Sequence, residues 1–114
     1  MSSDSSYSER RGGERVLIRI PIKLYALGKE GQHVNEPSET VVVSRFGAMV
    51  RASVPLKQTS TIEVMNNFSQ EVEKFRVVWV ADKPKDGKFD VGIELVRPRE
   101  DFWGVSFPAR ARKA

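Results

Sequence analysis

Two arginines, Arg11 and Arg15, stand immediately before the first run of alternating apolar residues in this 114-residue chain. The guanidinium group is planar and donates hydrogen bonds in pairs, so it suits a phosphate or the O6 and N7 atoms of a guanine. Arg10 adds a third cation, and Gly12 and Gly13 let the arginines reorient with little steric resistance. The pattern predicts an anion or nucleotide site; the alternative is a solvated basic segment that leads into a strand.

A second cluster, Ser44-Arg45-Phe46-Gly47, separates two later runs of alternating residues. The Ser44 hydroxyl can donate or accept a hydrogen bond, and Arg45 can contact a phosphate. Gly47 is expected to take a positive φ and to let the backbone approach a ligand closely. The cluster predicts a second part of a ligand site; the alternative is an ordinary hairpin turn, which needs no ligand.

The residues around these clusters alternate with a period of two, which is typical of half-buried β-strands. Six strands are predicted, at 16–25, 40–44, 48–53, 61–65, 72–81 and 89–96. A loop is predicted at 28–38, and Pro21, which has no N–H, predicts a free edge or a bulge in the first strand. Six short strands without a long helical pattern indicate an all-β fold. We expect a six-stranded antiparallel β-barrel, because closing the ring removes exposed edges.

Apolar and aromatic side chains on the inner faces are predicted to build the core. In the first strand the inward residues are Ile18, Ile20, Ile22 and Leu24. Phe75 and Trp79 alternate on a later strand and are also expected to point inward. A short helical turn is expected at 99–104. The aromatic residues there and just beyond are expected to plug the barrel: Phe102, Trp103 and Phe107. A patch that docks a partner is the alternative for this plug.

The length and composition predict one domain with polar ends. Residues 1–9 are serine-rich and lack apolar periodicity, so they are predicted to be a disordered tail. The barrel domain is predicted at 10–108 and a basic tail at 109–114. The formal net charge of +4 allows an anionic partner, although the cations are concentrated near the two ends. No apolar run reaches the length of a membrane span and no signal-peptide core is found, so a cytoplasmic protein without membrane contact is expected.

Residue types that serve in catalysis are scarce in the chain. It has no cysteine, and its single histidine, His33, falls in the predicted loop. The carboxylate pairs Glu71 with Glu73, and Asp82 with Asp86, are expected to be solvated charges on a strand and a turn. We therefore expect no enzymatic activity, no metal site and no bound cofactor.

The order of the two clusters within a six-stranded chain resembles the PilZ domain, a receptor for cyclic di-GMP. The resemblance rests on Arg-x-x-x-Arg before the first strand and on Ser-x-x-Gly between the second and third strands. It extends from about residue 10 to residue 107 and includes the last strand, Val91-Gly92-Ile93-Glu94-Leu95.

The resemblance implies a set of ligand-binding residues that match the two motifs or flank them: Arg11, Arg15, Ser44, Gly47, Arg10 and Arg45. The family motif also has aspartate or asparagine two residues before the serine, where this chain has Val42. A carboxylate or amide there would accept from the N1–H and N2–H₂ groups of guanine. Its loss costs about 1–3 kcal/mol, or roughly five- to 150-fold in affinity.

The resemblance implies a regulatory domain that binds cyclic di-GMP. The ligand would order the N-terminal segment over the barrel, and the ordered surface would engage a protein partner. Val42 favours one alternative, a degenerate PilZ-like module that binds a protein and no nucleotide. The other alternative is a small basic barrel that binds nucleic acid, which is disfavoured because the aromatic residues are predicted to point inward.

Overall fold

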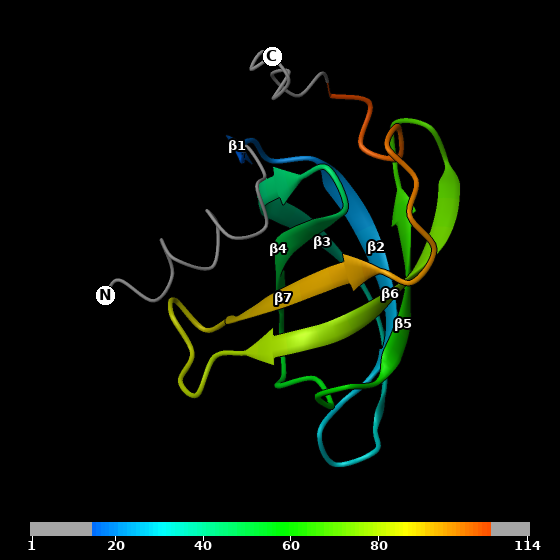
Figure 1. The fold of residues 1–114 in the computed structure, drawn as a ribbon. Helices are drawn as coiled ribbons and strands as arrows, with labels where there is room; N and C mark the ends of the chain where they lie inside the picture. The colour runs from blue at the N-terminus through cyan, green and yellow to red at the C-terminus, as the bar shows by residue number, and fades with distance from the viewer. Residues whose placement is uncertain (1–14, 106–114) are drawn as a thin grey trace.

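The computed structural model describes residues 15–105, which form seven β-strands and no helix (Figure 1). The strands are β1 (Val16–Leu17), β2 (Pro21–Leu27), β3 (His33–Ser44), β4 (Gly47–Ala52), β5 (Thr61–Asn66), β6 (Glu71–Val80) and β7 (Phe89–Leu95). Arg10, Arg11 and the predicted tails at 1–9 and 109–114 lie outside the described residues. Within the part of the chain that is described, no helix is long and apolar enough to cross a membrane.

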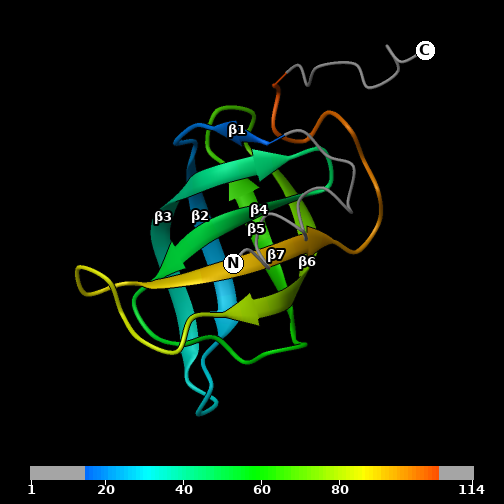
Figure 2. The same ribbon diagram turned by 60° about the vertical axis from the view of Figure 1, so that its left-hand side comes forward.

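Six of these strands close into an antiparallel barrel. They are hydrogen-bonded in the order β3-β2-β5-β6-β7-β4, and the pairing of β4 with β3 completes the ring. The remaining strand, β1, pairs with the end of β3 that leads into β4, as Figure 2 shows. The predicted all-β fold with a six-stranded antiparallel barrel is therefore confirmed.

The first predicted strand is divided into β1 and β2, because its register with β3 slips by one residue between them. The hydroxyl of Thr40 bridges the gap: it accepts the N–H of Ile20 at 2.8 Å and donates to the carbonyl of Ile18 at 2.7 Å. Pro21 opens β2, so the irregularity predicted from its missing N–H is confirmed. Ile18 was predicted to point inward and is 37% exposed, because the slip removes it from the alternation.

The predicted loop at 28–38 is wrong for most of its length, since β3 already begins at His33. Residues 33–39 pair with β2 in one continuous register. The loop that joins β2 to β3 is therefore short. In this loop Gly31 has a φ of 88°, and its N–H donates to the carbonyl of Gly28 at 2.9 Å. This part of the sequence contains polar residues and a proline, so it lacks a clear alternation of apolar and polar side chains. It forms a strand because it pairs with β2.

Strand β6 contains a β-bulge that reverses the alternation of its side chains. Val77 pairs with Ile93, whereas Trp79 pairs with Gly92, so two residues of β6 face one residue of β7. Phe75 precedes the bulge and is fully buried, as predicted. Trp79 follows it and is 48% exposed, so the prediction that Trp79 lies in the core is wrong.

The barrel interior is filled mainly by aliphatic side chains from all six strands of the ring. Each of the following is at most 2% exposed: Ile20, Ile22, Leu24, Val43, Val50, Ile62, Val64, Val77, Val91 and Ile93. Burial of a side chain of this size contributes roughly 1.5–3 kcal/mol, so this interior provides most of the driving force for folding.

The segment after β7 closes one end of the barrel, as predicted. Phe102 and Trp103 are 1% and 2% exposed, and their ring centroids lie 5.6 and 5.7 Å from that of Phe75. The buried side chain of Asn66, at the end of β5, donates to the carbonyl of Phe102 at 2.9 Å. The third predicted member of the plug, Phe107, lies outside the described residues.

Arg99 attaches this segment to β6 through three carboxylates. Its guanidinium donates to Asp101 at 2.8 Å, to Glu73 at 3.1 Å and also to Glu71. These bonds raise the pKa of Arg99, and the bond from Arg99 lowers the pKa of Asp101. Glu71 and Glu73 are thus ion-paired rather than simply solvated. The helical turn predicted here is wrong; the chain makes a tight turn in which the N–H of Gly104 donates to the carbonyl of Asp101 at 3.2 Å.

Candidate ligand-binding face

The Ser44-Gly47 cluster forms a two-residue hairpin turn at one end of the barrel. Ser44 ends β3 and pairs directly with Gly47, the first residue of β4. A Cβ atom at Gly47 would lie 2.5 Å from the carbonyl oxygen of Ile93 on β7. The close approach of β7 therefore requires glycine here. The predicted turn is confirmed, but the predicted positive φ of Gly47 is wrong.

Two contacts from the C-terminal segment hold this turn in place. The indole N–H of Trp103 donates to the carbonyl of Gly47 at 3.1 Å. The Nη1 atom of Arg45 lies 3.2 Å from Oε1 of Glu100. The arginine that the sequence marked as a phosphate contact is therefore already part of an ion pair, and the protein itself preorganises the turn.

Strand β1 brings the end of the Arg-x-x-x-Arg segment beside this turn. Val16 pairs with Val43, so the preceding residue, Arg15, comes level with Ser44. Arg15 is exposed. Arg15 and the Ser44-Gly47 turn, which come from distant parts of the sequence, thus lie at the same end of the barrel.

An apolar row crosses the outer face of β1, β3, β4, β7 and β6, which lie one beside the next in Figure 2. The strand register sets its members level with one another: Leu17, Val42, Met49, Gly92 and Trp79. Leu17 is 81% exposed and Trp79 is 48% exposed, whereas Val42 is 8% exposed and does not belong to the core cluster. Trp79 packs over Gly92, because a Cβ atom at that glycine would lie 3.4 Å from Cβ of Trp79.

A polar row runs parallel to the apolar row, two residues closer to the Ser44-Gly47 turn along β3. Its members are also level in register: Ser44, Gly47, Glu94 and Arg76. Glu94 leans over Gly47, since its Cγ atom lies 3.6 Å from the place where a Cβ of that glycine would be. Arg15, the residue before β1, continues this row one strand beyond Ser44.

Together the two rows offer the groups that a flat, anionic ligand requires. The apolar row can take the face of an aromatic ring, with the indole of Trp79 as a stacking partner. The polar row supplies a hydroxyl, a carboxylate and guanidinium groups for the ring edge and for an anion. Val42, which stands where the PilZ motif has a hydrogen-bonding side chain, is buried and offers little surface to a ligand. Among residues 15–105 no group of His, Asp or Glu side chains is arranged to hold a metal ion.

Two residues of this face, Trp79 and Glu94, were missed as site residues by sequence reasoning. The available signal was Gly92, because a glycine inside an alternating strand indicates a bulge or a close approach of another group. The outward position of Trp79 also weakens the argument against nucleic-acid binding, which assumed that the aromatic residues point inward.

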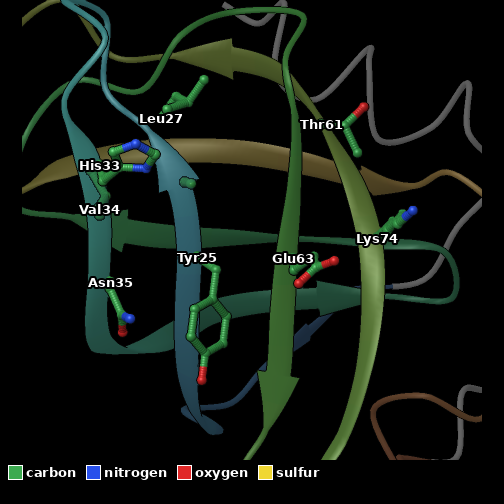
Figure 3. Close-up of a pocket in the computed structure, with 9 residues that line it drawn as sticks. Tyr25, Leu27, His33, Val34, Asn35, Thr61, Glu63 and Lys74 are labelled. Carbon is green, nitrogen blue, oxygen red and sulfur yellow. The ribbon is translucent and has the colours of Figure 1, made fainter.

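A hollow lies on the outer face of β3, β2, β5 and β6, away from the Ser44-Gly47 turn (Figure 3). It is an open groove of about 450 Å³ whose lining includes Tyr25, His33, Asn35, Glu63 and Lys74. His33 is exposed, but it is the first residue of β3 rather than part of the predicted loop. Of the predicted ligand-binding residues that the structure describes, namely Arg15, Ser44, Arg45 and Gly47, none lines this groove.

A scan of the chain against protein-family models gave no match, and a search of the curated proteins found no relative.

Proposed function

We propose that this chain is a PilZ-like regulatory domain that binds cyclic di-GMP on the outer face of β1, β3, β4, β7 and β6. The observation that carries the proposal is the pairing of β1 with β3, which sets Arg15 level with Ser44. Arg15, the last residue of the first motif, and the Ser44-Gly47 turn therefore lie at the same end of a barrel of the expected strand number. An exposed tryptophan on the same face supports the proposal further.

Each side chain has a role that its chemistry suits. Arg11 and Arg15 hold a phosphate and the O6 and N7 atoms of a guanine through paired hydrogen bonds. The Ser44 hydroxyl bonds a base or a phosphate oxygen, and Trp79 stacks on a base, which contributes about 1–3 kcal/mol. Arg45 turns from Glu100 toward a phosphate when the ligand brings a stronger negative charge.

The segment that contains Arg10 and Arg11 has the regulatory role. Their bonds to the ligand would draw this segment onto the barrel face beside β1. The ligand would thereby create a surface composed of the N-terminal segment and the barrel, and a protein partner would recognise that surface.

Calorimetric titration with cyclic di-GMP tests the proposal. The wild-type chain is expected to release or take up heat with saturation at micromolar ligand. Arg15→Ala should weaken binding by about tenfold or more, as expected for a charge-assisted hydrogen-bonding group. Arg97→Ala is the matched control, because Arg97 is an exposed arginine beyond the end of β7 that lines a separate hollow with Val72, Lys74 and Val96. Absence of heat at high micromolar ligand, or equal affinities for the two variants, would overturn the proposal.

A second candidate function is docking of a protein without any nucleotide. It is favoured by the apolar row itself, in which Leu17 is 81% exposed, and by Val42 at the position of the missing hydrogen-bonding group. Under this alternative neither the wild type nor Val42→Asp binds cyclic di-GMP. Salt-sensitive, sequence-independent filter binding of single-stranded nucleic acid would instead favour the remaining alternative, in which Trp79 stacks on successive bases.

A further inference from the structure

The polar row ends on β6 at Arg76, an exposed arginine that belongs to neither sequence motif. We infer that Arg76 contacts the edge of the base that stacks on Trp79 and that it makes this part of the site prefer guanine over adenine. The inference rests on the proposed binding of cyclic di-GMP and names a residue that sets the specificity of that same face.

The guanidinium group of Arg76 is available to a ligand. Four arginines of residues 15–105 are ion-paired with carboxylates: Arg19, Arg45, Arg51 and Arg99. Among the described residues, the guanidinium of Arg76 has no partner in a hydrogen bond or an ion pair. Glu94 stands opposite Arg76 on β7, but the two side chains form no ion pair. A ligand can therefore recruit Arg76 without breaking an existing bond.

The β-bulge of β6 places Arg76 and Trp79 on the same outer face. Residues three apart on a regular strand point to opposite faces, because side chains alternate. Here the register shifts between Val77 and Trp79, so the alternation reverses. Phe75 and Val77, on either side of Arg76, are fully buried, whereas Trp79 is 48% exposed. Bulges are frequent beside functional sites, where they redirect a side chain, and this one brings a guanidinium and an indole together.

The strand register sets the distance between these two side chains. Arg76 pairs with Glu94 and Trp79 pairs with Gly92, so the two positions are two residues of β7 apart, about 6.7 Å. The indole lies over Gly92. A ring that stacks on the indole therefore turns one edge toward Arg76, within reach of that long side chain. Arg15 lies at the other end of the polar row, four strand spacings or about 19 Å away along the sheet, and is too distant to contact the same base.

Guanine and adenine differ at the edge that an arginine recognises. Guanine presents two acceptors, O6 and N7, which take a pair of hydrogen bonds from one guanidinium group. Adenine also has N7, but the N6 amino group replaces O6, so one guanidinium N–H would face another donor. Lysine carries the same charge as arginine but lacks the planar fork of donors. The preference for guanine should therefore depend on the fork and not on the positive charge alone.

The test measures the affinities of cyclic di-GMP and cyclic di-AMP by calorimetry for the wild type, Arg76→Lys and Arg76→Gln. The wild type is expected to bind the guanine dinucleotide more tightly. Each variant should reduce the ratio of the two affinities by about five- to 150-fold, the range given by one bidentate contact to a base. The free energy of unfolding in urea should not change, because Arg76 is exposed.

Arg97→Lys and Arg97→Gln are the matched controls. Arg97 is also exposed, and among the described residues its guanidinium likewise has no partner in a hydrogen bond or an ion pair. It lies beyond the end of β7, outside the two rows. Both control variants should keep the ratio of the wild type.

The possible outcomes separate this inference from the proposed function. If the wild type binds cyclic di-GMP and both Arg76 variants keep its ratio of affinities, the role of Arg76 is overturned while the proposed function stands. If Arg76→Lys keeps the ratio and only Arg76→Gln lowers it, Arg76 contributes charge and does not recognise the base edge, so the inference is also overturned. If the wild type binds neither dinucleotide, the proposed function fails, and the inference fails with it.

Discussion

The two outer faces of the barrel differ in how regularly their strands pair. On the face with the groove, β2 pairs with β3 and with β5, and β5 pairs with β6, each in an unbroken register. On the face with the apolar and polar rows, the register shifts between Thr40 and Val42 on β3 and between Val77 and Trp79 on β6. Regular pairing keeps the alternation that can be read from the sequence, whereas each bulge changes which residues reach the surface.

The side chains of the two faces differ in the same way. On the groove face, Tyr25 is level with Glu63, Glu63 is level with Lys74, and the ammonium of Lys23 lies 5.7 Å from the ring centroid of Tyr25. Complementary groups thus stand beside one another, as in an ordinary solvated sheet. The other face exposes Leu17 and Trp79 beside arginine and glutamate. The comparison is consistent with the proposed placement of the ligand on the irregular face.

The largest effect is expected from adding one methyl group to the irregular face. Gly47→Ala places a Cβ 2.5 Å from the backbone carbonyl of Ile93, so β4 and β7 must separate. We expect a loss of about 2–3 kcal/mol in the free energy of unfolding, measured by urea denaturation, and loss of nucleotide binding. Gly28→Ala is the matched control, because its Cβ would meet only the flexible side chain of Gln32. Equal losses for the two variants would contradict the assignment of a backbone constraint at Gly47.

Removal of the exposed indole should affect binding and leave the fold nearly unchanged. Trp79→Ala is expected to weaken binding of cyclic di-GMP by about five- to 150-fold, the range given by the loss of one stacking contact. The free energy of unfolding should change by about 1 kcal/mol or less, because Trp79 is 48% exposed. Calorimetry and urea denaturation measure the two quantities. Tyr25→Ala, which removes an aromatic ring from the groove face, should leave the affinity unchanged; an equal loss in that variant would place the ligand elsewhere.

The plug makes a smaller contribution through a single hydrogen bond to the turn. Trp103→Phe keeps an aromatic ring in the core but removes the N–H that donates to the Gly47 carbonyl at 3.1 Å. A buried carbonyl without its donor should cost about 1–2 kcal/mol in the free energy of unfolding. Amide hydrogen exchange should also quicken at the turn more than at the hairpin between β2 and β3. An equal increase in exchange rate at both hairpins would show that this hydrogen bond does not specifically stabilise the Ser44-Gly47 turn.

The smallest effect concerns the attachment of the C-terminal segment at low pH. The hydrogen bond from Arg99 lowers the pKa of Asp101 below its ordinary value of about 3.9. A lowered pKa in the folded state contributes stability above the ordinary value, and that contribution is lost as the pH falls through the lower, folded value. Because the Asp101 side chain is 79% exposed, solvent screens the interaction and the effect on stability is small.

Carboxyl carbon chemical shifts in an NMR titration measure this pKa directly. Arg99→Gln should return the pKa of Asp101 to the ordinary aspartate value, whereas Arg97→Gln should leave it lowered. If Arg99→Gln leaves the pKa of Asp101 unchanged, Arg99 is not the cause of the lowered pKa.

The candidate site was only partly predictable for a physical reason. The types of Arg15, Ser44 and Gly47 and the turn between the second and third strands could be read from the chain, because turn chemistry and guanidinium chemistry are local properties. The roles of Trp79 and Glu94 could not be read, because each depends on which residue of β7 lies opposite β4 or β6. A bulge costs little locally and leaves a weak trace in the sequence, here a single glycine at position 92.

Local patterns in the chain were enough to predict the all-β class, the closed six-stranded barrel and most strand positions, because a period of two and strong turn residues act over a few neighbouring positions. Three features arose only from packing and strand pairing: the separation of β1 from β2, the strand at 33–39 and the outward position of Trp79. These outcomes depend on pairing between segments far apart in the chain, where Thr40 bonds Ile18 and Ile20 and where β7 crosses close to Gly47. Local patterns predict which residues can face the core. The register between strands that are distant in the sequence determines which of these residues are buried.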